Sequence, residues 1–284
     1  MTAPPNRRDL MGVGGLRLAA DYWPGGDRGF VLLSHGGGQT RHAWGETGAM
    51  LAAKGYEVLS VDLRGHGDSA WDPHHDYRIE TFSADLITLL ETMDVGPAIL
   101  IGASLGGIAS LLAAGGEAAF RIRALVLVDI TPHPRLEGIE RIRAFMNSAP
   151  EGFADLDAAA DAVAAYLPGR RRPRSTAGLM KNLRERGGRL HWHWDPQFLA
   201  VTSHAHEASG AVQETIARRI TAPTLLVRGQ QSEVVSAEDA EAFRRLVPHS
   251  ELVEVEDAAH MVAGDHNTVF GEAVVSFLAA LPPL

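Results

Sequence analysis

The chain of 284 residues contains no cysteine. This absence excludes disulfide bonds, a thiolate nucleophile and cysteine-ligated metal, and it suits a reducing compartment, so we expect a cytoplasmic protein. The sequence also lacks any uninterrupted apolar run of roughly eighteen residues, which a membrane-spanning helix needs. We therefore expect no membrane partner.

Positive charge is scarce, with 26 Lys and Arg against 35 Asp and Glu and a formal net charge of -9. A surface that tracks phosphates needs an excess of basic residues, so we expect no nucleic-acid partner. Lysine occurs only at Lys54 and Lys181, and the preference for arginine together with abundant alanine and glycine indicates a bacterial source. Asn6–Leu10 contains an arginine pair, as export signals do, but no apolar segment follows it, and we expect no export.

Six short apolar runs alternate with helical patterns along the chain. These runs are Phe30–Ser34, Tyr56–Val61, Ala98–Gly102, Ala124–Asp129, Thr224–Arg228 and Glu251–Val255. Such a pattern predicts an α/β protein whose parallel sheet is covered on both faces by helices. Before these runs, Leu16–Trp23 alternates as an antiparallel edge strand does.

The alternation of strands and helices stops for about ninety residues. We interpret residues 131–220 as a helical cap inserted into a core formed by residues 1–130 and 221–284. Within the insertion, Leu156–Leu167 has apolar residues at the spacing of a helix with one buried face. The composition, 45% hydrophobic, suits one core domain with such an insertion.

The pentapeptide Gly102-Ala103-Ser104-Leu105-Gly106 has the G-x-S-x-G pattern of a nucleophile elbow. It directly follows an apolar strand and precedes the helical run Ile108–Ala114, which is the context that the pattern requires. Glycines allow the tight turn that holds the serine hydroxyl exposed above the sheet. Ser104 is therefore the candidate nucleophile.

A second glycine-rich segment, Ser34-His35-Gly36-Gly37-Gly38, follows the strand that begins at Phe30. Backbone N–H groups of such a loop bind the negative oxygen that forms when a carbonyl is attacked. We assign the oxyanion hole to the N–H groups of Gly37 and Leu105.

A serine hydroxyl is a poor nucleophile unless a base removes its proton. Among thirteen histidines, His260 has the best position, because it directly follows the last predicted strand. His266 is the nearest competitor but precedes the closing helix expected at Val269–Leu281. We expect His260 to be the general base.

These motifs, with Asp62–Ser69 after the fourth strand, resemble the α/β-hydrolase superfamily, in particular a bacterial serine esterase, lactonase and perhydrolase branch with a helical cap. The resemblance implies a mostly parallel eight-stranded sheet with the cap after strand six. A serine nucleophile, in place of the aspartate that relatives use on alkyl carbons, implies an acyl-enzyme formed from an ester, thioester or lactone. It implies a small-molecule acyl substrate and no metal or other cofactor, and leaves a homodimer open.

The acid partner of His260 departs from the family pattern. The family places an aspartate shortly after the glycine that follows the predicted strand Thr224–Arg228, here Gly229. Ser232 occupies that register, and a hydroxyl cannot stabilise an imidazolium as a carboxylate does. We favour Glu233, the next residue, as the acid. Asp129, at the end of strand six, is the alternative.

Other functions use the same residues. The alternatives are cleavage of a carbon–carbon bond or an enol-lactone in aromatic catabolism, cofactor-free perhydrolysis, and small-molecule reception with slow turnover. Alternating histidines at His191 and His193, with a second group at 204–206, lack a third metal ligand at a suitable spacing. We expect Trp192 and Trp194, beside the first group, to pack the cap or line an apolar acyl pocket.

Overall fold

A computed structural model describes residues 4–166, 177–202, 206–260 and 267–282. Within them lies one eight-stranded sheet with the strand order β1-β2-β4-β3-β5-β6-β9-β10. The strands are β1 Asn6–Met11, β2 Arg17–Trp23, β3 Phe30–Ser34, β4 Glu57–Val61, β5 Ala98–Ala103, β6 Ile122–Val128, β9 Thr224–Gly229 and β10 Glu251–Val255. All pairs from β4 to β10 are parallel, which confirms the predicted sheet.

The antiparallel end of the sheet has one strand more than the apolar pattern indicates. β2 is antiparallel to β4, as predicted, but it is not the edge strand, because β1 pairs with its other side. β1 contains the arginine pair Arg7-Arg8 and is mostly exposed. A strand with so little buried surface has no apolar alternation by which the sequence could reveal it.

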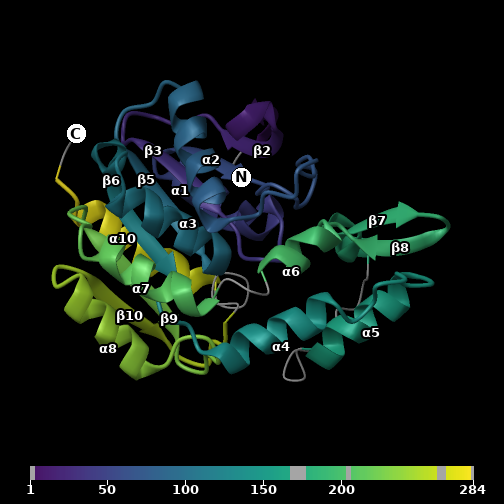
Figure 1. The fold of residues 1–284 in the computed structure, drawn as a ribbon. Helices are drawn as coiled ribbons and strands as arrows, with labels where there is room; N and C mark the ends of the chain where they lie inside the picture. The colour runs from purple at the N-terminus through teal and green to yellow at the C-terminus, as the bar shows by residue number, and fades with distance from the viewer. Residues whose placement is uncertain (1–3, 167–176, 203–205, 261–266, 283–284) are drawn as a thin grey trace.

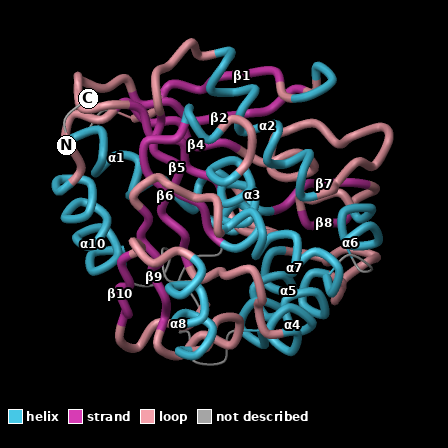
Figure 2. Tube along the Cα trace, turned by 60° about the vertical axis from the view of Figure 1, so that its left-hand side comes forward, coloured by secondary structure: helices cyan, strands magenta, loops and turns pink. Residues whose placement is uncertain are grey.

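Helices cover both faces of the sheet (Figure 2). One face carries α1 Gly45–Ala53 and α10 Asn267–Ala280, and the other carries α2 Ile79–Thr92, α3 Ser104–Gly115, α7 His206–Ala217 and α8 Ala237–Leu246. Successive residues of each central strand alternate between these layers: Leu32 packs with the α2 and α3 side, and Leu33 with the α1 and α10 side. No described helix is long and apolar enough to cross a membrane.

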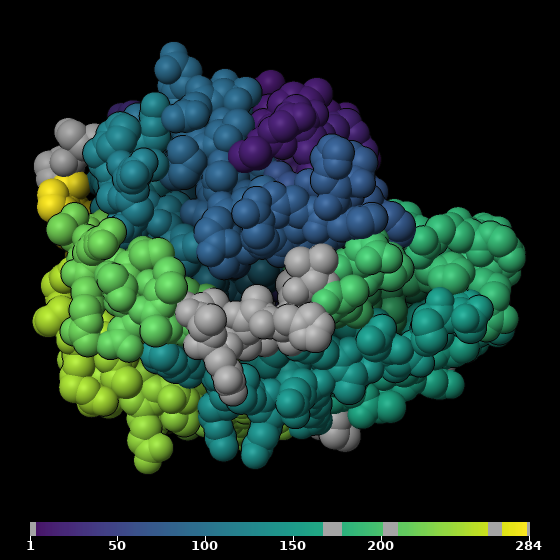
Figure 3. Space-filling view, in the orientation of Figure 1, coloured from purple at the N-terminus to yellow at the C-terminus, as the bar shows by residue number. Residues whose placement is uncertain are grey.

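Between β6 and β9, the chain forms a cap that projects beyond the sheet (Figures 1 and 3). Its elements are α4 Leu136–Met146, α5 Leu156–Tyr166, the short 3-10 helix η4 Ala177–Asn182, β7 Leu183–Arg186, β8 Arg189–Trp192 and α6 Pro196–Thr202. The last helix of the insertion, α7, lies instead on the core, where a Cβ at Gly115 of α3 would come within 2.3 Å of the Ile216 carbonyl oxygen. The region that we predicted as an insertion therefore includes one helix of the sheet's outer layer.

The cap also contains the β7–β8 hairpin, which the prediction of a helical cap omitted. Its two-residue turn is Gly187-Gly188, with φ values of 58° and 75°. Positive φ at both positions is the geometry of a type I′ turn, for which a Gly-Gly pair is a recognised signal. The signal was present in the sequence, but the arginine-rich flanks obscured the strand alternation.

Candidate active site

The candidate catalytic residues gather at one edge of the sheet. Ser104 begins α3 directly after β5, Asp129 directly follows β6, and His260 lies five residues after β10. Because these strands are parallel, their carboxyl ends meet at the same edge, where α/β proteins place their sites. The oxyanion loop, defined here as residues 34–39, leaves β3 at that edge.

The turn that carries Ser104 has the strained geometry of a nucleophile elbow. The φ of Ser104 is 47°, in the left-handed region that non-glycine residues rarely adopt. Glycine is required two residues later, because a Cβ at Gly106 would lie 2.5 Å from the Ser34 carbonyl oxygen. The Gly106 N–H donates to the His35 carbonyl oxygen at 3.1 Å, which ties the elbow to the oxyanion loop. Ser104 is thereby held at the positive end of the α3 dipole.

His260 is bound to Asp129, not to Glu233. The distance from His260 Nδ1 to Asp129 Oδ2 is 2.7 Å. The Asp129 carboxylate is completely buried, and the imidazole is 17% exposed. A carboxylate only accepts hydrogen bonds, so Nδ1 carries the proton and Nε2 is free to accept one, as a general base must.

Ser232 holds the Asp129 carboxylate in place. Its hydroxyl oxygen accepts the N–H groups of Val234 and Val235, both at 3.1 Å, so its own proton is donated to Asp129 Oδ2, at 2.5 Å. The Gly229 N–H donates to Asp129 Oδ1 at 3.1 Å. A hydroxyl cannot replace a carboxylate as the partner of His260, but Ser232 supports the carboxylate that follows the neighbouring strand β6.

The preference for Glu233 as the partner of His260 requires correction. The Glu233 side chain is 56% exposed and forms an ion pair with Arg141 of α4. The turn after β9 directs residue 232 inward and the next side chain outward, while the Glu233 carbonyl packs against Gly138 of α4. The other residue considered for the base, His266, lies outside the described residues.

Two donors fix the peptide group that precedes Gly37. The Gly36 carbonyl oxygen accepts the Gln39 N–H at 3.1 Å and lies 2.8 Å from His35 Nδ1. His35 Nε2 accepts the Leu63 N–H at 3.0 Å, so Nδ1 is the protonated nitrogen and donates to Gly36. Within the described part of the chain, the Gly37 N–H has no acceptor. It is therefore available to an oxyanion.

The segment Asp62–Ser69 serves as scaffolding beside this loop. The Asp62 carboxylate is buried, accepts the backbone N–H of Arg41 at 2.6 Å, and forms an ion pair with its guanidinium. Arg41 also pairs with Asp21 and Asp68, at 2.9 Å each. One guanidinium thus binds β2 and the loops after β3 and β4 together at the site edge.

Two cap residues lie over the oxyanion loop. A Cβ at Gly37 would meet the Phe198 ring of α6 at 3.7 Å, and one at Gly38 would meet the Met146 side chain of α4 at 3.2 Å. The expected aromatic pair packs within the cap: Trp192 and Trp194 are buried and stacked, with ring centroids 5.1 Å apart. Met146 and Phe198 supply apolar surface beside the oxyanion loop.

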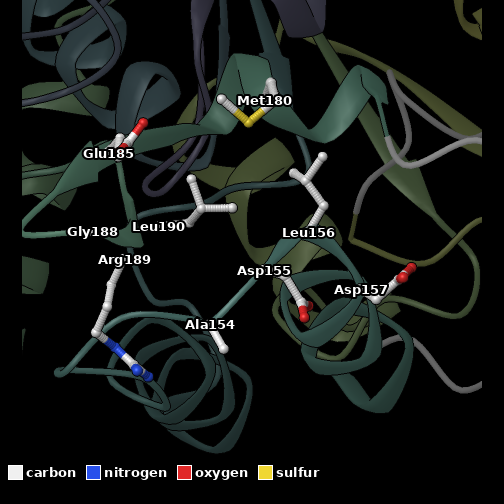
Figure 4. A pocket seen from close by; sticks show the side chains of 9 residues that line it. All are labelled: Ala154, Asp155, Leu156, Asp157, Met180, Glu185, Gly188, Arg189 and Leu190. Carbon is white, nitrogen blue, oxygen red and sulfur yellow. The ribbon is translucent and has the colours of Figure 1, made fainter.

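An open depression of about 590 Å³ lies farther out on the cap, between α5 and the β7–β8 hairpin (Figure 4). Leu156, Met180 and Leu190 form its apolar part, and none of its lining residues belongs to the candidate site. Among the described residues, no group of three histidines or carboxylates could hold a metal ion. His204 and Ala205 of the second histidine group lie outside the described residues.

Three buried histidines lower the stability of the protein in acid. Burial lowers the pKa of His35 from 6.5 to about 4 and that of His66 to about 3, and it holds the pKa of His193 well below 6.5. The unfolded chain therefore binds protons at a higher pH than the folded chain does. The free energy of unfolding should fall as the pH drops below about 6.5, by about 2 kcal/mol for each of His35 and His66 between pH 7 and pH 5, and His193 adds to the loss in the same direction.

Urea unfolding at pH 7 and pH 5 measures this loss. His66→Asn retains a donor for the Arg64 carbonyl oxygen, which His66 Nδ1 contacts at 3.0 Å, but it removes one titrating group, so the difference should shrink. His74→Gln, at an exposed histidine, should leave it unchanged. An equal difference in the His66→Asn variant and in the unmodified protein would contradict this account.

Comparison with known proteins identifies the family. The family model described as "alpha/beta hydrolase fold" matches residues 29–267. The chain is 30% identical to esterase Rv0045c of Mycobacterium tuberculosis over 264 residues, which cover 90% of this chain and 85% of that protein. It is 30% identical to 2-(acetamidomethylene)succinate hydrolase of Mesorhizobium japonicum over 227 residues, or 79% of each.

Solved structures agree with the sequence relatives. A crystal structure of E-2-(acetamidomethylene)succinate hydrolase superposes with a TM-score of 0.87 at 25% identity, covering 97% of this chain and 100% of that chain. A structure of the Mycobacterium tuberculosis esterase Rv0045c gives a TM-score of 0.76 at 27% identity, over 99% and 94% of the two chains. The chain belongs to the α/β-hydrolase fold family and is a hydrolase.

Proposed function

We propose that this protein hydrolyses a carboxylic ester, thioester or lactone through an acyl-enzyme on Ser104. The observation that carries the proposal is the 2.7 Å hydrogen bond from His260 to the buried Asp129, at the sheet edge where Ser104 occupies a strained elbow. An ordinary surface histidine has no such carboxylate behind it. The similarity to esterase Rv0045c supports an ester as the substrate.

The proposed reaction proceeds in two halves. His260 Nε2 takes the Ser104 proton as the hydroxyl oxygen attacks the carbonyl carbon, and the N–H groups of Gly37 and Leu105 bind the resulting oxyanion. The tetrahedral intermediate collapses, His260 gives the proton to the leaving oxygen or sulfur, and the acyl group remains on Ser104. Water, deprotonated by His260, then attacks the acyl carbon and releases the acid and the free serine.

The parts of the oxyanion hole come from two elements. Leu105 is the second residue of α3, and the N–H groups of the first helical turn have no acceptor within the helix. Gly37 faces the Phe198 ring. Its N–H belongs to the Gly36–Gly37 peptide group, whose carbonyl oxygen accepts a hydrogen bond from His35. Both donors are therefore set before substrate arrives, as electrostatic stabilisation of a transition state requires.

A fluorophosphonate probe, together with a panel of p-nitrophenyl esters, tests the proposed function. We expect the probe to label Ser104 alone, as located by peptide mass spectrometry, and the acetate and butyrate esters to be hydrolysed with a burst of p-nitrophenol. Heat-denatured protein is the control for non-specific labelling. Absence of both labelling and turnover would contradict the proposal, and labelling with negligible turnover would favour the slow small-molecule receptor.

A second candidate is a substrate that carries its own carboxylate. The relative whose name contains a succinate supports it. In the same ester panel, faster turnover of p-nitrophenyl hemisuccinate than of the butyrate would favour this candidate.

A further inference from the structure

A histidine of the cap contacts two loops of the core, the oxyanion loop and the scaffolding segment Asp62–Ser69. His193 follows β8 and is almost completely buried. Its Nδ1 accepts the Gly67 N–H at 2.7 Å, and its Nε2 lies 3.3 Å from the Gly38 carbonyl oxygen. Gly67 belongs to the scaffolding segment after β4, and Gly38 to the oxyanion loop.

These two contacts determine the tautomer of His193. An N–H group can only donate, so Nδ1 is the unprotonated nitrogen, and Nε2 carries the proton and donates it to Gly38. Burial, with smaller contributions from His66 and His35, holds the pKa of His193 well below 6.5. The ring is therefore neutral and makes both contacts at neutral pH.

The Gly38 contact completes the support of Gly37. His35 holds the Gly36 carbonyl, which belongs to the peptide group of the Gly37 N–H, and His193 holds the Gly38 carbonyl, which lies two peptide groups further along the loop. Gly38 has a φ of 74°, so the chain turns sharply between the two anchors. An error of about 1 Å in a catalytic group lowers the rate steeply. The oxyanion loop is thus held on either side of Gly37, by a residue of the core and by a residue of the cap.

We propose that His193 is a positioning residue for the oxyanion hole, so that the cap sets the geometry of a catalytic group as well as covering the substrate. This inference rests on the proposed function. It assigns to the segment 191–195 a role other than metal binding or packing. The His193 ring acts through the Gly38 carbonyl and does not touch the substrate.

Two amide side chains separate the two contacts of His193. The nitrogen of glutamine can occupy the place of Nε2, and the oxygen of asparagine the place of Nδ1. His193→Gln therefore preserves the donor to Gly38 and loses the acceptor for Gly67, whereas His193→Asn preserves the Gly67 contact and loses the Gly38 contact. His193→Ala removes both.

Turnover of p-nitrophenyl acetate distinguishes positioning from general stability. We expect His193→Asn and His193→Ala to lower kcat about ten- to hundred-fold with less than a two-fold change in KM, because the oxyanion forms only after binding. His193→Gln should keep kcat within about three-fold, even where its melting temperature is lower. The corresponding thionoester is the second substrate, because its sulfur accepts hydrogen bonds from the oxyanion N–H groups only weakly. The ratio of oxoester turnover to thionoester turnover should therefore fall only in the His193→Asn and His193→Ala variants.

Three outcomes decide the proposal. Loss of oxoester preference in His193→Asn with rescue in His193→Gln supports it. An equal loss of kcat on both substrates in all variants, in proportion to the loss of melting temperature, would show that His193 only packs. Unchanged kinetics in every variant would show that His193 has no part in catalysis. Failure of the proposed function itself is visible separately, since the unmodified protein would then neither turn over the ester nor react with the fluorophosphonate.

Discussion

Ser104→Ala is expected to abolish hydrolysis of p-nitrophenyl acetate, with kcat lower by roughly 10⁴- to 10⁶-fold. The serine oxygen supplies the bond that holds the acyl group, and neither His260 nor the oxyanion hole can replace it. The fold should persist, because the hydroxyl lies at a half-buried elbow and the substitution leaves the φ of 47° as strained as before. Initial rates, fluorophosphonate labelling and a thermal melt measure the three expectations.

Ser148→Ala is the matched control, because Ser148 is an exposed serine of the cap whose hydroxyl only donates to the Phe145 carbonyl oxygen. It should retain activity and labelling. Retention of more than a few per cent of activity by Ser104→Ala, after purification that excludes a contaminating esterase, would remove Ser104 from its proposed role.

Asp129→Asn is expected to lower kcat by about 10⁴-fold. An amide can donate to His260 Nδ1, which favours the tautomer whose Nε2 carries a proton and cannot accept one from Ser104. Asparagine tolerates a φ of 51° better than most residues, but the melting temperature should fall, because an amide NH₂ turned toward His260 leaves the buried Ser232 hydroxyl without the acceptor that Asp129 Oδ2 supplies. Rates and melts of the same preparations provide the comparison.

Glu233→Gln is the natural partner experiment. It removes the charge that we first favoured, but this charge faces Arg141 at the surface, and kcat should stay within about two-fold of the unmodified protein. Should Glu233→Gln lose most activity while Asp129→Asn keeps it, the acid would be Glu233 after all, and the pairing of His260 with Asp129 would have no catalytic meaning.

The sequence predicts the sheet and the elbow because both have strong local signals. A parallel central strand is buried on both faces, so β3 appears as an apolar run with the boundaries that the structure shows. The elbow is determined within five residues, because a side chain at Gly102 or Gly106 would collide with neighbouring backbone atoms. His260 follows from its place after the last strand.

The acid and the cap depend on contacts between distant segments. Whether Glu233 or Asp129 faces His260 depends on the direction in which the turn after β9 projects residue 232, and spacing alone does not contain that direction. In the sequence His193 resembles half of a metal site, because its hydrogen-bond donor, the Gly67 N–H, and its acceptor, the Gly38 carbonyl oxygen, are backbone groups more than a hundred residues away. Nearly every residue has these backbone groups, so a contact with them does not appear as a sequence motif.

The order of the site residues along the chain has a consequence for biosynthesis. Ser104 and Asp129 precede the cap, whereas His260 follows β10, the strand that closes the far edge of the sheet. A growing chain therefore contains Ser104 and Asp129 well before His260 is added. Under the proposed mechanism, hydrolysis becomes possible only when the final strand has docked and His260 has reached Asp129, so that catalytic competence reports the completion of the fold.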